Sequence, residues 1–293
     1  MMIEQFMADR NQPGGRQLGL SHRYTLRTLQ RGNLGPILPA DVRAVDFLTH
    51  CKARRASGRQ PSTVNQDMTY VGGMLKYHVE ILETPGAEVA YAAYKKAQPQ
   101  LIREQLVGKS QPRTRRPTPE ELATILAHYA AQSLGRKNSI PMHDIVKFAY
   151  LTGRRISETC RILWADLDTE KRTCTVRDLK NSKGKGFHDT FPLLGEAWDL
   201  VMAQPRTSER IFPREAKSCT QNFINMKKAL GMPTLRLHDM RREAFSRMFE
   251  EGYSVPEVQK LSLHRNAKIL LENYTALAPE SLHLGPASKR ATA

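Results

Sequence analysis

The stretch LRLHDMRREAFSRMFEEGYSVPEVQKLSLHRNAKILLENYTAL, residues 235–277, decides how the rest of the chain is interpreted. Its apolar spacing and turn residues predict three helices, over 238–250, 255–262 and 268–277. Positions three apart share one face of a helix, so His238 and Arg241 can direct an imidazole and a guanidinium at the same anion. The last helix carries Tyr274, whose phenol can reach that place. This stretch therefore predicts a helical region that assembles an anion site.

The residues before this stretch predict a mainly helical domain with one small antiparallel sheet. Helical patterns cover 119–132, 142–151, 195–204 and 219–230. Two short strand patterns, at 171–178 and 187–193, are joined by the glycine-punctuated loop LKNSKGKG. In LTGRRISETCRILWADLD, Gly153 ends one helix, and Arg154 and Arg155 fall at the joint before the next.

A separate helical domain precedes this one. Its clearest helix begins at Ser62 and repeats apolar residues at intervals of three and four, at Val64, Met68, Val71, Leu75, Val79 and Leu82. Other helices are expected from Ser21 and after Pro39, and AEVAYAAYKKAQPQLIREQL predicts a fourth with a flaw at Pro99. A chain of 293 residues has room for two domains. We expect a flexible arm at 1–20, a helical domain at 21–106, a basic linker at 107–117, a second domain at 118–285 and a loose tail at 286–293.

The charge balance indicates a polyanionic partner. The chain carries 45 Lys and Arg against 29 Asp and Glu, a formal net charge of +16. A field of that sign makes nucleic acid the first candidate and acidic lipid the second. No apolar run reaches the roughly 18 residues that a membrane span requires. The N-terminal sequence lacks the apolar core of a signal peptide, which predicts a cytoplasmic protein.

The absence of two kinds of motif restricts the chemistry that the chain can perform. The four cysteines are widely spaced and form no C-x-x-C pair, so we expect reduced buried thiols rather than a zinc site or a disulfide framework. The chain has no GxxxxGK[ST], GxGxxG or HExxH motif, so we expect no cofactor and no catalytic metal. Any phosphate chemistry would then depend on side chains alone.

The segment REQLVGKSQPRTRR, residues 103–116, has the composition of a charged linker, with five basic residues against one acidic residue. Two interpretations stay open. The segment is either a soluble hinge or a strap along a phosphate backbone, where each neutralised phosphate releases counterions. The candidate DNA contacts in it are Lys109, Arg113, Arg115 and Arg116.

Taken together, the motifs resemble those of one known family. TGRRISE resembles the box T-G-x-R-x-x-E, LHDMRREAFSRMFEEG resembles H-D-L-R-H-T-x-A-S-x-x-x-x-x-G, and SLHRNAKILLENYT resembles L-G-H-x-x-x-x-T-x-x-x-Y-T. These are patterns of the tyrosine recombinase (phage integrase) family, and the resemblance covers about 118–280. The sequence departs from them at Leu263, where the family usually has glycine, and at Arg242, which replaces a common histidine. The interval from His264 to Tyr274 is also one residue longer than usual.

The resemblance implies a two-domain DNA clamp, with a helical core-binding domain at 21–106 and a mixed α/β catalytic domain at 118–285. It also implies that six residues surround a scissile phosphate, namely Arg155, Lys180, His238, Arg241, His264 and Tyr274. Tyr274 would be the nucleophile and Lys180 the proton donor to the leaving 5′ oxygen. Lys183 and Lys185 lie in the same loop and are alternatives to Lys180.

Elementary chemistry agrees with these roles. Displacement at a phosphodiester builds negative charge on the non-bridging oxygens, which two guanidiniums can neutralise through paired hydrogen bonds. A phenol has a pKa of about 10, so the nucleophile needs a base, and His238 is the candidate. His264 would form a hydrogen bond to a phosphate oxygen.

We therefore expect a site-specific DNA recombinase, the integrase of a mobile element, acting on double-stranded DNA through a 3′-phosphotyrosyl intermediate without ATP or metal. Strand exchange needs two cut sites, which predicts a homo-oligomer, expected to be a tetramer in a synaptic complex, with residues 281–284 docking on a neighbour. Two alternatives stay open. One is a type IB topoisomerase, which relaxes one duplex without synapsis, and the other is a non-catalytic DNA-binding regulator of the same fold.

Overall fold

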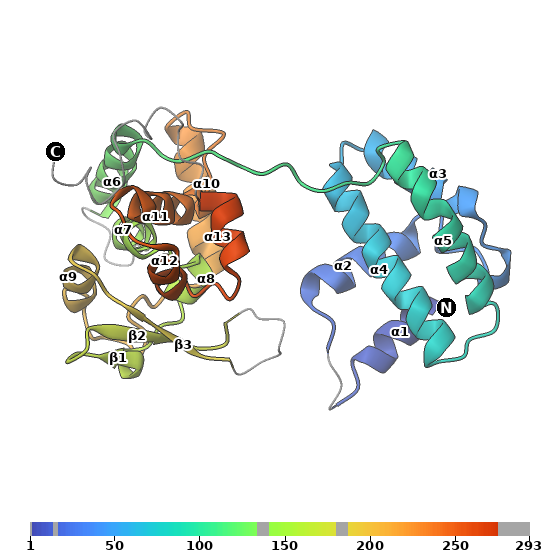
Figure 1. Ribbon diagram of the computed structural model, residues 1–293, viewed down its shortest axis with the longest axis horizontal. Coiled ribbons are helices and arrows are strands. Elements are labelled where there is room, and N and C mark those ends of the chain that lie inside the picture. The colour runs from blue at the N-terminus through green and yellow to red at the C-terminus, as the bar shows by residue number, and fades with distance from the viewer. Residues whose placement is uncertain (1, 14–16, 134–140, 180–186, 275–293) are drawn as a thin grey trace. The chain divides into compact units, whose positions relative to one another are not determined.

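A computed structural model describes residues 2–13, 17–133, 141–179 and 187–274. The chain divides into two compact units, with the boundary between Pro112 and Arg113. Both units are predominantly helical, and the second contains a small sheet (Figure 1). The fold class predicted from the sequence, mainly α with a small antiparallel sheet, is therefore confirmed.

The first unit is built around one long helix. Its elements are α1 (Met2–Arg10), α2 (Leu20–Arg31), the 3-10 helix η1 (Pro39–Asp41), α3 (Ala44–Ala56), α4 (Pro61–Glu80) and α5 (Ala87–Arg103). The side chains of Val64, Met68, Val71 and Leu75 on α4 are all buried, as their spacing predicts. α5 lies beside α4 and continues through Pro99 without a break (Figure 1).

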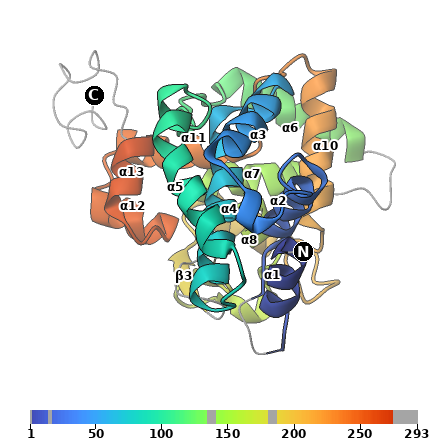
Figure 2. The same cartoon turned by 90° about the vertical axis from the view of Figure 1, so that its right-hand side faces the viewer.

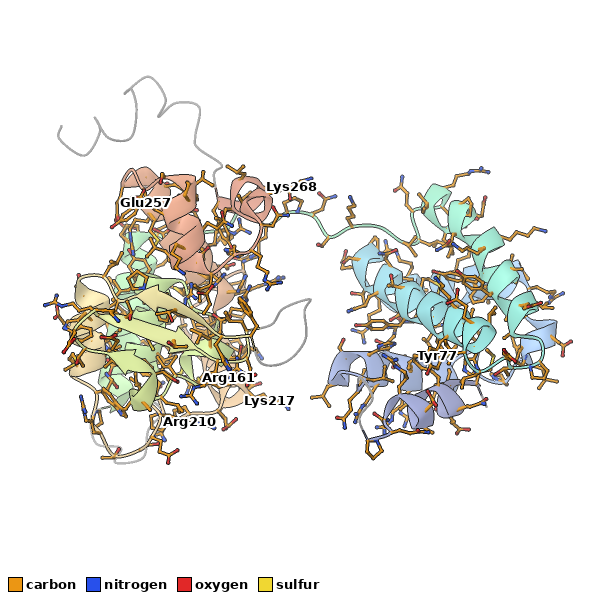
Figure 3. The ribbon with its side chains drawn as sticks, turned by 60° about the horizontal axis from the view of Figure 1, so that its bottom comes forward. Tyr77, Arg161, Arg210, Lys217, Glu257 and Lys268 are labelled. Atoms are coloured by element: carbon orange, nitrogen blue, oxygen red, sulfur yellow. The ribbon has the colours of Figure 1, made fainter. Side chains whose placement is uncertain are left out.

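The first helix corrects the expectation that residues 1–20 form a flexible arm. α1 buries Phe6, whose ring meets Tyr77 of α4 edge-on with 5.3 Å between ring centroids. The hydroxyl of Tyr77, labelled in Figure 3, donates a hydrogen bond to Asp9 at 2.5 Å. The prediction was wrong for α1 because it weighed only local polarity, whereas this helix is stabilised by contacts with a segment far along the chain.

The second unit contains the remaining elements. They are α6 (Pro119–Ser133), α7 (Met142–Thr152), α8 (Ile156–Thr159), the 3-10 helix η2 (Trp164–Asp166), β1 (Leu167–Asp168), β2 (Thr173–Val176), β3 (Asp189–Pro192), α9 (Glu196–Met202), α10 (Ala216–Ala229), α11 (His238–Glu250), α12 (Val255–Ser262) and α13 (Ala267–Tyr274). The helices predicted over 238–250 and 255–262 match α11 and α12 to the residue.

The sheet has three antiparallel strands in the order β1-β2-β3, one more than the sequence predicts. The missed strand β1 is only two residues long and is defined by its pairing of Leu167 with Cys174. In the next pair, Cys174 lies opposite Phe191, and both side chains are buried, so alternate residues face the core. The loop between β2 and β3 includes residues 180–186, which lie outside the described residues.

α11 occupies the centre of the second unit. It packs against α7, α12 and α13, and the last two lie side by side in both Figure 1 and Figure 2. α12 begins with a capping box, because Glu257 accepts hydrogen bonds from the backbone N–H and the hydroxyl of Ser254, both at 2.6 Å. Leu263 follows the helix as its C-cap, and its φ of 57° lies in the left-handed region.

The remaining sequence expectations concern thiols and membranes. The four cysteines Cys51, Cys160, Cys174 and Cys219 are buried free thiols, as predicted. The sulfur atoms of Cys160 and Cys219 lie 3.9 Å apart. Within the described residues, no helix combines the length and the apolar character needed to cross a membrane.

Candidate active site

α11 begins at His238, and the next residue fixes that start. The buried carboxylate of Asp239 accepts a hydrogen bond from the backbone N–H of Arg236 at 2.8 Å. It also accepts two hydrogen bonds from the guanidinium of Arg113, at 2.8 and 2.7 Å. These bonds compensate for the burial of the carboxylate and hold the first turn of α11 in place. The position of the His238 side chain follows from that anchoring.

Arg155 precedes α8 at the joint that the sequence predicts. Gly153, with a φ of +65°, ends α7 and reverses the chain just before it. The Nη1 atom of Arg155 donates to Glu158 at 2.6 Å, and its backbone N–H donates to the same carboxylate at 3.1 Å. The Arg155 side chain is 37% exposed, so part of it is accessible to a ligand.

Arg241, on the first turn of α11, connects three segments. Its Nη1 atom donates to the carbonyl of Gly153 at 2.6 Å, and its Nη2 atom donates to the carbonyl of Ser262 at 3.3 Å. The same Nη2 atom lies 3.0 Å from the Nε2 atom of His264. The guanidinium carbon is 4.7 Å from the centre of the Phe245 ring. Arg241 is therefore buried where the ends of α7 and α12 meet α11.

His264 follows α12 and is held by the last residue of that helix. Its Nδ1 atom lies 2.7 Å from the hydroxyl oxygen of Ser262, which also accepts the backbone N–H of His264 at 3.3 Å. Desolvation lowers the pKa of His264 to about 3, and the charges of Arg241 and Arg155 act in the same direction. The imidazole is therefore neutral at neutral pH.

Tyr274 ends α13 and is mostly buried in a small aromatic cluster. Its ring centroid is 5.3 Å from that of Phe245 and 5.7 Å from that of His264. Desolvation lowers the pKa of Arg241 to about 10, while the neighbouring phenol of Tyr274 acts in the opposite direction. The phenol is therefore near enough to interact electrostatically with the guanidinium of Arg241. Ser246 of α11 holds the backbone through a hydrogen bond to the carbonyl of Tyr274 at 3.4 Å.

Three arginines surround the buried carboxylate of Glu158. Besides the bond from Arg155, its Oε2 atom lies 4.0 Å from Nη1 of Arg154 and 4.0 Å from Nη1 of Arg241. Burial alone would raise the pKa of Glu158, but the charges of the three arginines leave it lowered. One carboxylate cannot neutralise three guanidiniums, so this cluster carries net positive charge. That excess suits a phosphate.

His238 lies at the edge of the same cluster. Desolvation, followed by the charges of Arg241 and Arg155, lowers the pKa of His238, although part of the ring remains exposed to solvent. A neutral imidazole with an accessible edge can accept a proton from an incoming nucleophile.

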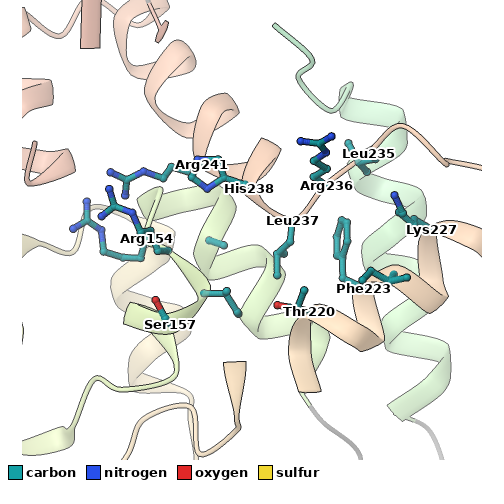
Figure 4. A pocket seen from close by; sticks show the side chains of 14 residues that line it. Arg154, Ser157, Thr220, Phe223, Lys227, Leu235, Arg236, Leu237, His238 and Arg241 are labelled. Atoms are coloured by element: carbon teal, nitrogen blue, oxygen red, sulfur yellow. The ribbon is translucent and has the colours of Figure 1, made fainter. Parts of the chain in front are cut away.

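A cavity of about 540 Å³ opens beside these groups. Figure 4 shows Arg154, Arg241 and His238 at one end of it, and Phe223 and Lys227 at the other. The charged end can hold an anion, whereas the far end is lined partly by apolar side chains. Across the described part of the chain, no cluster of three or more His, Cys, Asp or Glu side chains could hold a metal ion.

Comparison with known proteins decides the family. The model of the phage integrase family matches residues 115–281, more than half of the chain. The chain belongs to the phage integrase family. The match includes the arginine cluster, both site histidines and Tyr274. It begins at Arg115, within the predicted linker.

Similar sequences carry recombinase names. A protein of Haemophilus influenzae with a provisional integrase/recombinase name is 27% identical over 175 residues, covering 59% of this family member and 56% of that protein. A second protein of that organism is 31% identical over 135 residues, covering 44% and 35%. The shufflon-specific DNA recombinase of Escherichia coli is 26% identical over 144 residues, covering 48% and 36%. The chain thus spans about a third to just over half of the length of these relatives.

Solved structures share the fold of this family member. The Tn1549 transposon integrase, in complex with circular intermediate DNA, matches with a TM-score of 0.69 and 17% identity, over 97% of this chain and 98% of that one. A lambda integrase bound as a dimer to a COC′ core site matches with a TM-score of 0.67 and 14% identity, over 92% and 75%. At such identities the likeness concerns the fold.

The structure brings together five of the six residues that the resemblance implies, namely Arg155, His238, Arg241, His264 and Tyr274. Lys180, Lys183 and Lys185 lie outside the described residues. In the linker, Arg113, Arg115 and Arg116 form ion pairs with carboxylates of the second unit, with Asp239, Glu121, Glu243 and Glu250.

Three site residues were absent from the sequence prediction. Glu158 had a signal, because it is the last letter of TGRRISE. No sequence signal identified Ser262 or Arg154. A serine at the end of a helix and a second arginine beside Arg155 are both usually found on the protein surface. Their roles depend on burial, which only the fold decides.

Proposed function

We propose that this chain is a site-specific DNA recombinase, the integrase of a mobile element, which cuts and rejoins double-stranded DNA in the cytoplasm through a 3′-phosphotyrosyl intermediate. The observation that carries the proposal is the position of Tyr274, whose ring centroid lies 5.7 Å from that of His264, the imidazole that Arg241 contacts at 3.0 Å. A tyrosine beside buried guanidiniums and neutral imidazoles is equipped to attack a phosphodiester.

In the cutting step, the Tyr274 oxygen forms a bond to phosphorus while the bond from phosphorus to the 5′ oxygen of the next nucleotide breaks. His238 accepts the phenol proton, and Lys180 supplies a proton to the leaving 5′ oxygen. Lys183 and Lys185 are the alternatives for that second role. Each proton thus has a donor and an acceptor, and the products are a phosphotyrosyl ester and a free 5′ hydroxyl.

During this step, hydrogen-bond donors that are already in place stabilise the negative charge on the phosphate. Arg155, which is partly exposed, and Arg241, which is buried, both lie against Glu158 and supply positive charge beside the phosphate. Such donors need no reorganisation as negative charge develops on the non-bridging oxygens. We assign His264 a hydrogen bond to one of these oxygens. Guanidiniums supply the positive charge in this scheme, so the reaction requires no metal ion.

Rejoining is the reverse step with a different 5′ hydroxyl. The ester retains the energy of the broken bond, so no ATP is needed. Exchange between two duplexes requires two cut sites, which favours a homo-oligomer, with a tetramer as the expected form. A lambda integrase with a similar fold has been solved as a tetramer bound to a Holliday junction, which supports this assembly.

The first unit offers a basic surface for duplex DNA. A groove of about 670 Å³ is lined by Arg23, Arg27 and Arg59 together with Tyr24, which is largely exposed. Arg54 also lines it but forms an ion pair with the buried Asp67 at 2.7 Å. Guanidiniums around an exposed aromatic ring suit contact with a phosphate backbone and the sugars beside it. We therefore propose this groove between α2 and α4 as the DNA-binding face of a core-binding domain.

We propose that the linker residues predicted from the sequence contribute unequally to DNA binding. Lys109 is exposed and has no partner among the described residues, so its charge is available to a phosphate. Arg113, Arg115 and Arg116 already hold carboxylates and are only about one third exposed. Lys109 therefore contributes more to DNA binding than the three arginines do, because a paired arginine must break its ion pair or share it with the phosphate.

The test of the proposal is a nicked suicide duplex carrying the junction of the mobile element, incubated with the protein and separated under denaturing conditions. We expect a covalent adduct with the native protein and none with Tyr274→Phe, while both proteins shift the duplex equally in a native gel. An adduct with the Phe variant would show that the nucleophile is another residue. Binding without an adduct in either protein would indicate a DNA-binding regulator, and relaxation of one duplex without paired-site exchange would indicate a topoisomerase.

A further inference from the structure

Arg154 is a buried charge that the family pattern does not require. The box T-G-x-R-x-x-E leaves this position open, and the catalytic role passes to Arg155. Yet Arg154 is 1% exposed, and its Nε and Nη1 atoms have no hydrogen-bond partner in the described part of the chain. Burying a guanidinium with unsatisfied donors is costly, so the contacts that it does form need an explanation.

These contacts lead to the carboxy-terminal end of α12. The Nη2 atom of Arg154 donates to the carbonyl of Leu261 at 2.6 Å, and its guanidinium lies 4.6 Å from the centre of the Phe191 ring. Arg241 donates to the next carbonyl, that of Ser262, at 3.3 Å. The last carbonyls of a helix lack partners within it and carry partial negative charge, so two guanidiniums bind them favourably.

The end of α12 in turn holds a site histidine. Ser262 is the last residue of the helix, and its hydroxyl oxygen lies 2.7 Å from Nδ1 of His264. Only Leu263, in the left-handed conformation, separates the two. A shift of the Leu261 and Ser262 carbonyls would therefore move the imidazole. The second ring nitrogen of His264 depends on Arg241, so both contacts of the ring depend on this junction.

We propose that Arg154 is a positioning residue which, together with Arg241, clamps the carboxy-terminal end of α12 and thereby fixes the imidazole of His264 in the site. The inference rests on the proposed function for its catalytic consequence, although the clamp itself is a property of the fold. Arg154 does not need to touch DNA in this role. Glu158, 4.0 Å from Nη1 of Arg154, offsets part of the like charge of the two arginines.

The test compares Arg154→Met with two other variants. Methionine keeps much of the stem and removes the charge, and replacing a buried charge by an apolar side chain of similar size commonly preserves folding. Arg154→Lys retains one donor for the Leu261 carbonyl and should rescue part of the effect. Arg247→Met is the matched control, because Arg247 also binds a carbonyl and an aromatic face, both of Tyr150, away from α12.

Two measurements separate the clamp from the chemistry. Amide hydrogen exchange over residues 263–266 should be about tenfold faster in Arg154→Met, intermediate in Arg154→Lys and unchanged in Arg247→Met. Formation of the covalent adduct at saturating nicked duplex should slow by about tenfold or more in Arg154→Met, while the Kd for the duplex stays within about twofold. A slower saturated rate with an unchanged Kd would show that Arg154 positions the site and does not bind DNA directly.

Several outcomes would overturn the inference. Unchanged exchange over residues 263–266 would mean that no clamp exists. A weaker Kd with an unchanged saturated rate would make Arg154 a DNA contact instead. Failure of both Arg154 variants to fold would assign the residue to general stability. If the native protein forms no adduct with any duplex, the proposed function fails, whereas hydrogen exchange still decides the clamp.

Discussion

The Nη2 atom of Arg241 lies 3.0 Å from the Nε2 atom of His264. A guanidinium can only donate, so this ring nitrogen must be the acceptor. The proton of the neutral imidazole is then on Nδ1, which donates to the hydroxyl oxygen of Ser262 at 2.7 Å. Both ring nitrogens are thus occupied in the free protein. To donate to a phosphate, His264 must release one of these two partners.

We predict that His264 stays neutral in its Nδ1–H form when the free protein is titrated. Its folded pKa of about 3 lies below the ordinary value of 6.5, so nitrogen-resolved NMR should show no titration of this ring over about pH 5 to 8. The unfolded chain takes up a proton below pH 6.5 that the folded chain rejects until pH 3, so stability falls as the pH drops through that window. His264→Gln should remove this part of the pH dependence in urea unfolding. A midpoint near 6.5 in the NMR titration would contradict the prediction.

Gly153→Ala should be destabilising for two reasons. The residue has a φ of +65°, and an added Cβ would lie 2.5 Å from Cζ of Phe245, a fully buried ring. We expect a loss of about 2 to 4 kcal/mol from backbone strain and overpacking together. Adduct formation should also slow, because Phe245 contacts the rings of His264 and Tyr274.

The matched control is Gly231→Ala, with a similar φ of +67° and no atom within 4 Å of an added Cβ. Backbone strain alone should cost it about 1 kcal/mol. Chemical denaturation of both variants gives the comparison. Equal losses would show that the Phe245 ring moves aside without cost.

At position 263, glycine should be more stable than alanine. Leu263 has a φ of 57° and a ψ of 30°, a conformation that disfavours every residue with a Cβ, and its side chain is only partly buried. Leu263→Ala loses most of the side chain and keeps the strain, whereas Leu263→Gly loses slightly more side chain and removes the strain. We expect Gly to exceed Ala by about 1 kcal/mol in the free energy of unfolding, the reverse of their order in a helix interior. Equal stability would mean that the turn relaxes in the variants.

Arg113 should matter more for stability than for DNA binding. Its guanidinium forms both hydrogen bonds to the buried carboxylate of Asp239, which strengthens the first turn of α11. Arg113→Ala leaves that carboxylate with the N–H of Arg236, so we expect a loss of about 2 kcal/mol. The hydrogen bonds to Asp239 raise the pKa of Arg113, so the guanidinium is charged at every accessible pH.

Lys109→Ala is the comparison for this prediction. An exposed lysine without a partner among the described residues should change stability by no more than about 0.5 kcal/mol. It should instead reduce the salt dependence of DNA binding by about one released counterion. Chemical unfolding and salt-dependent DNA binding should be measured for both variants. A stable Arg113→Ala protein with a reduced salt dependence of binding would show that Arg113 is instead a DNA contact.

Local sequence signals were enough to predict much of the secondary structure of the second unit. The bounds of α11 and α12 were predictable because capping and helical periodicity depend on neighbours three and four residues away, as Ser254 and Glu257 illustrate. The motif letters also identified the site side chains that converge, including His264 and Tyr274. The two-residue strand β1 and the docking of α1 on α4 were not predictable in this way.

The sequence by itself determined the helical class, the helix bounds around the site and the kinds of side chain that could serve phosphate chemistry. Only the tertiary structure decided that Arg154 is buried while Arg155 stays partly exposed, and that Glu158 lies among three guanidiniums. The physical reason is that periodicity and capping act within one turn of helix. The environment of a charged group depends instead on which distant segments exclude water from it and which of their carbonyls it reaches.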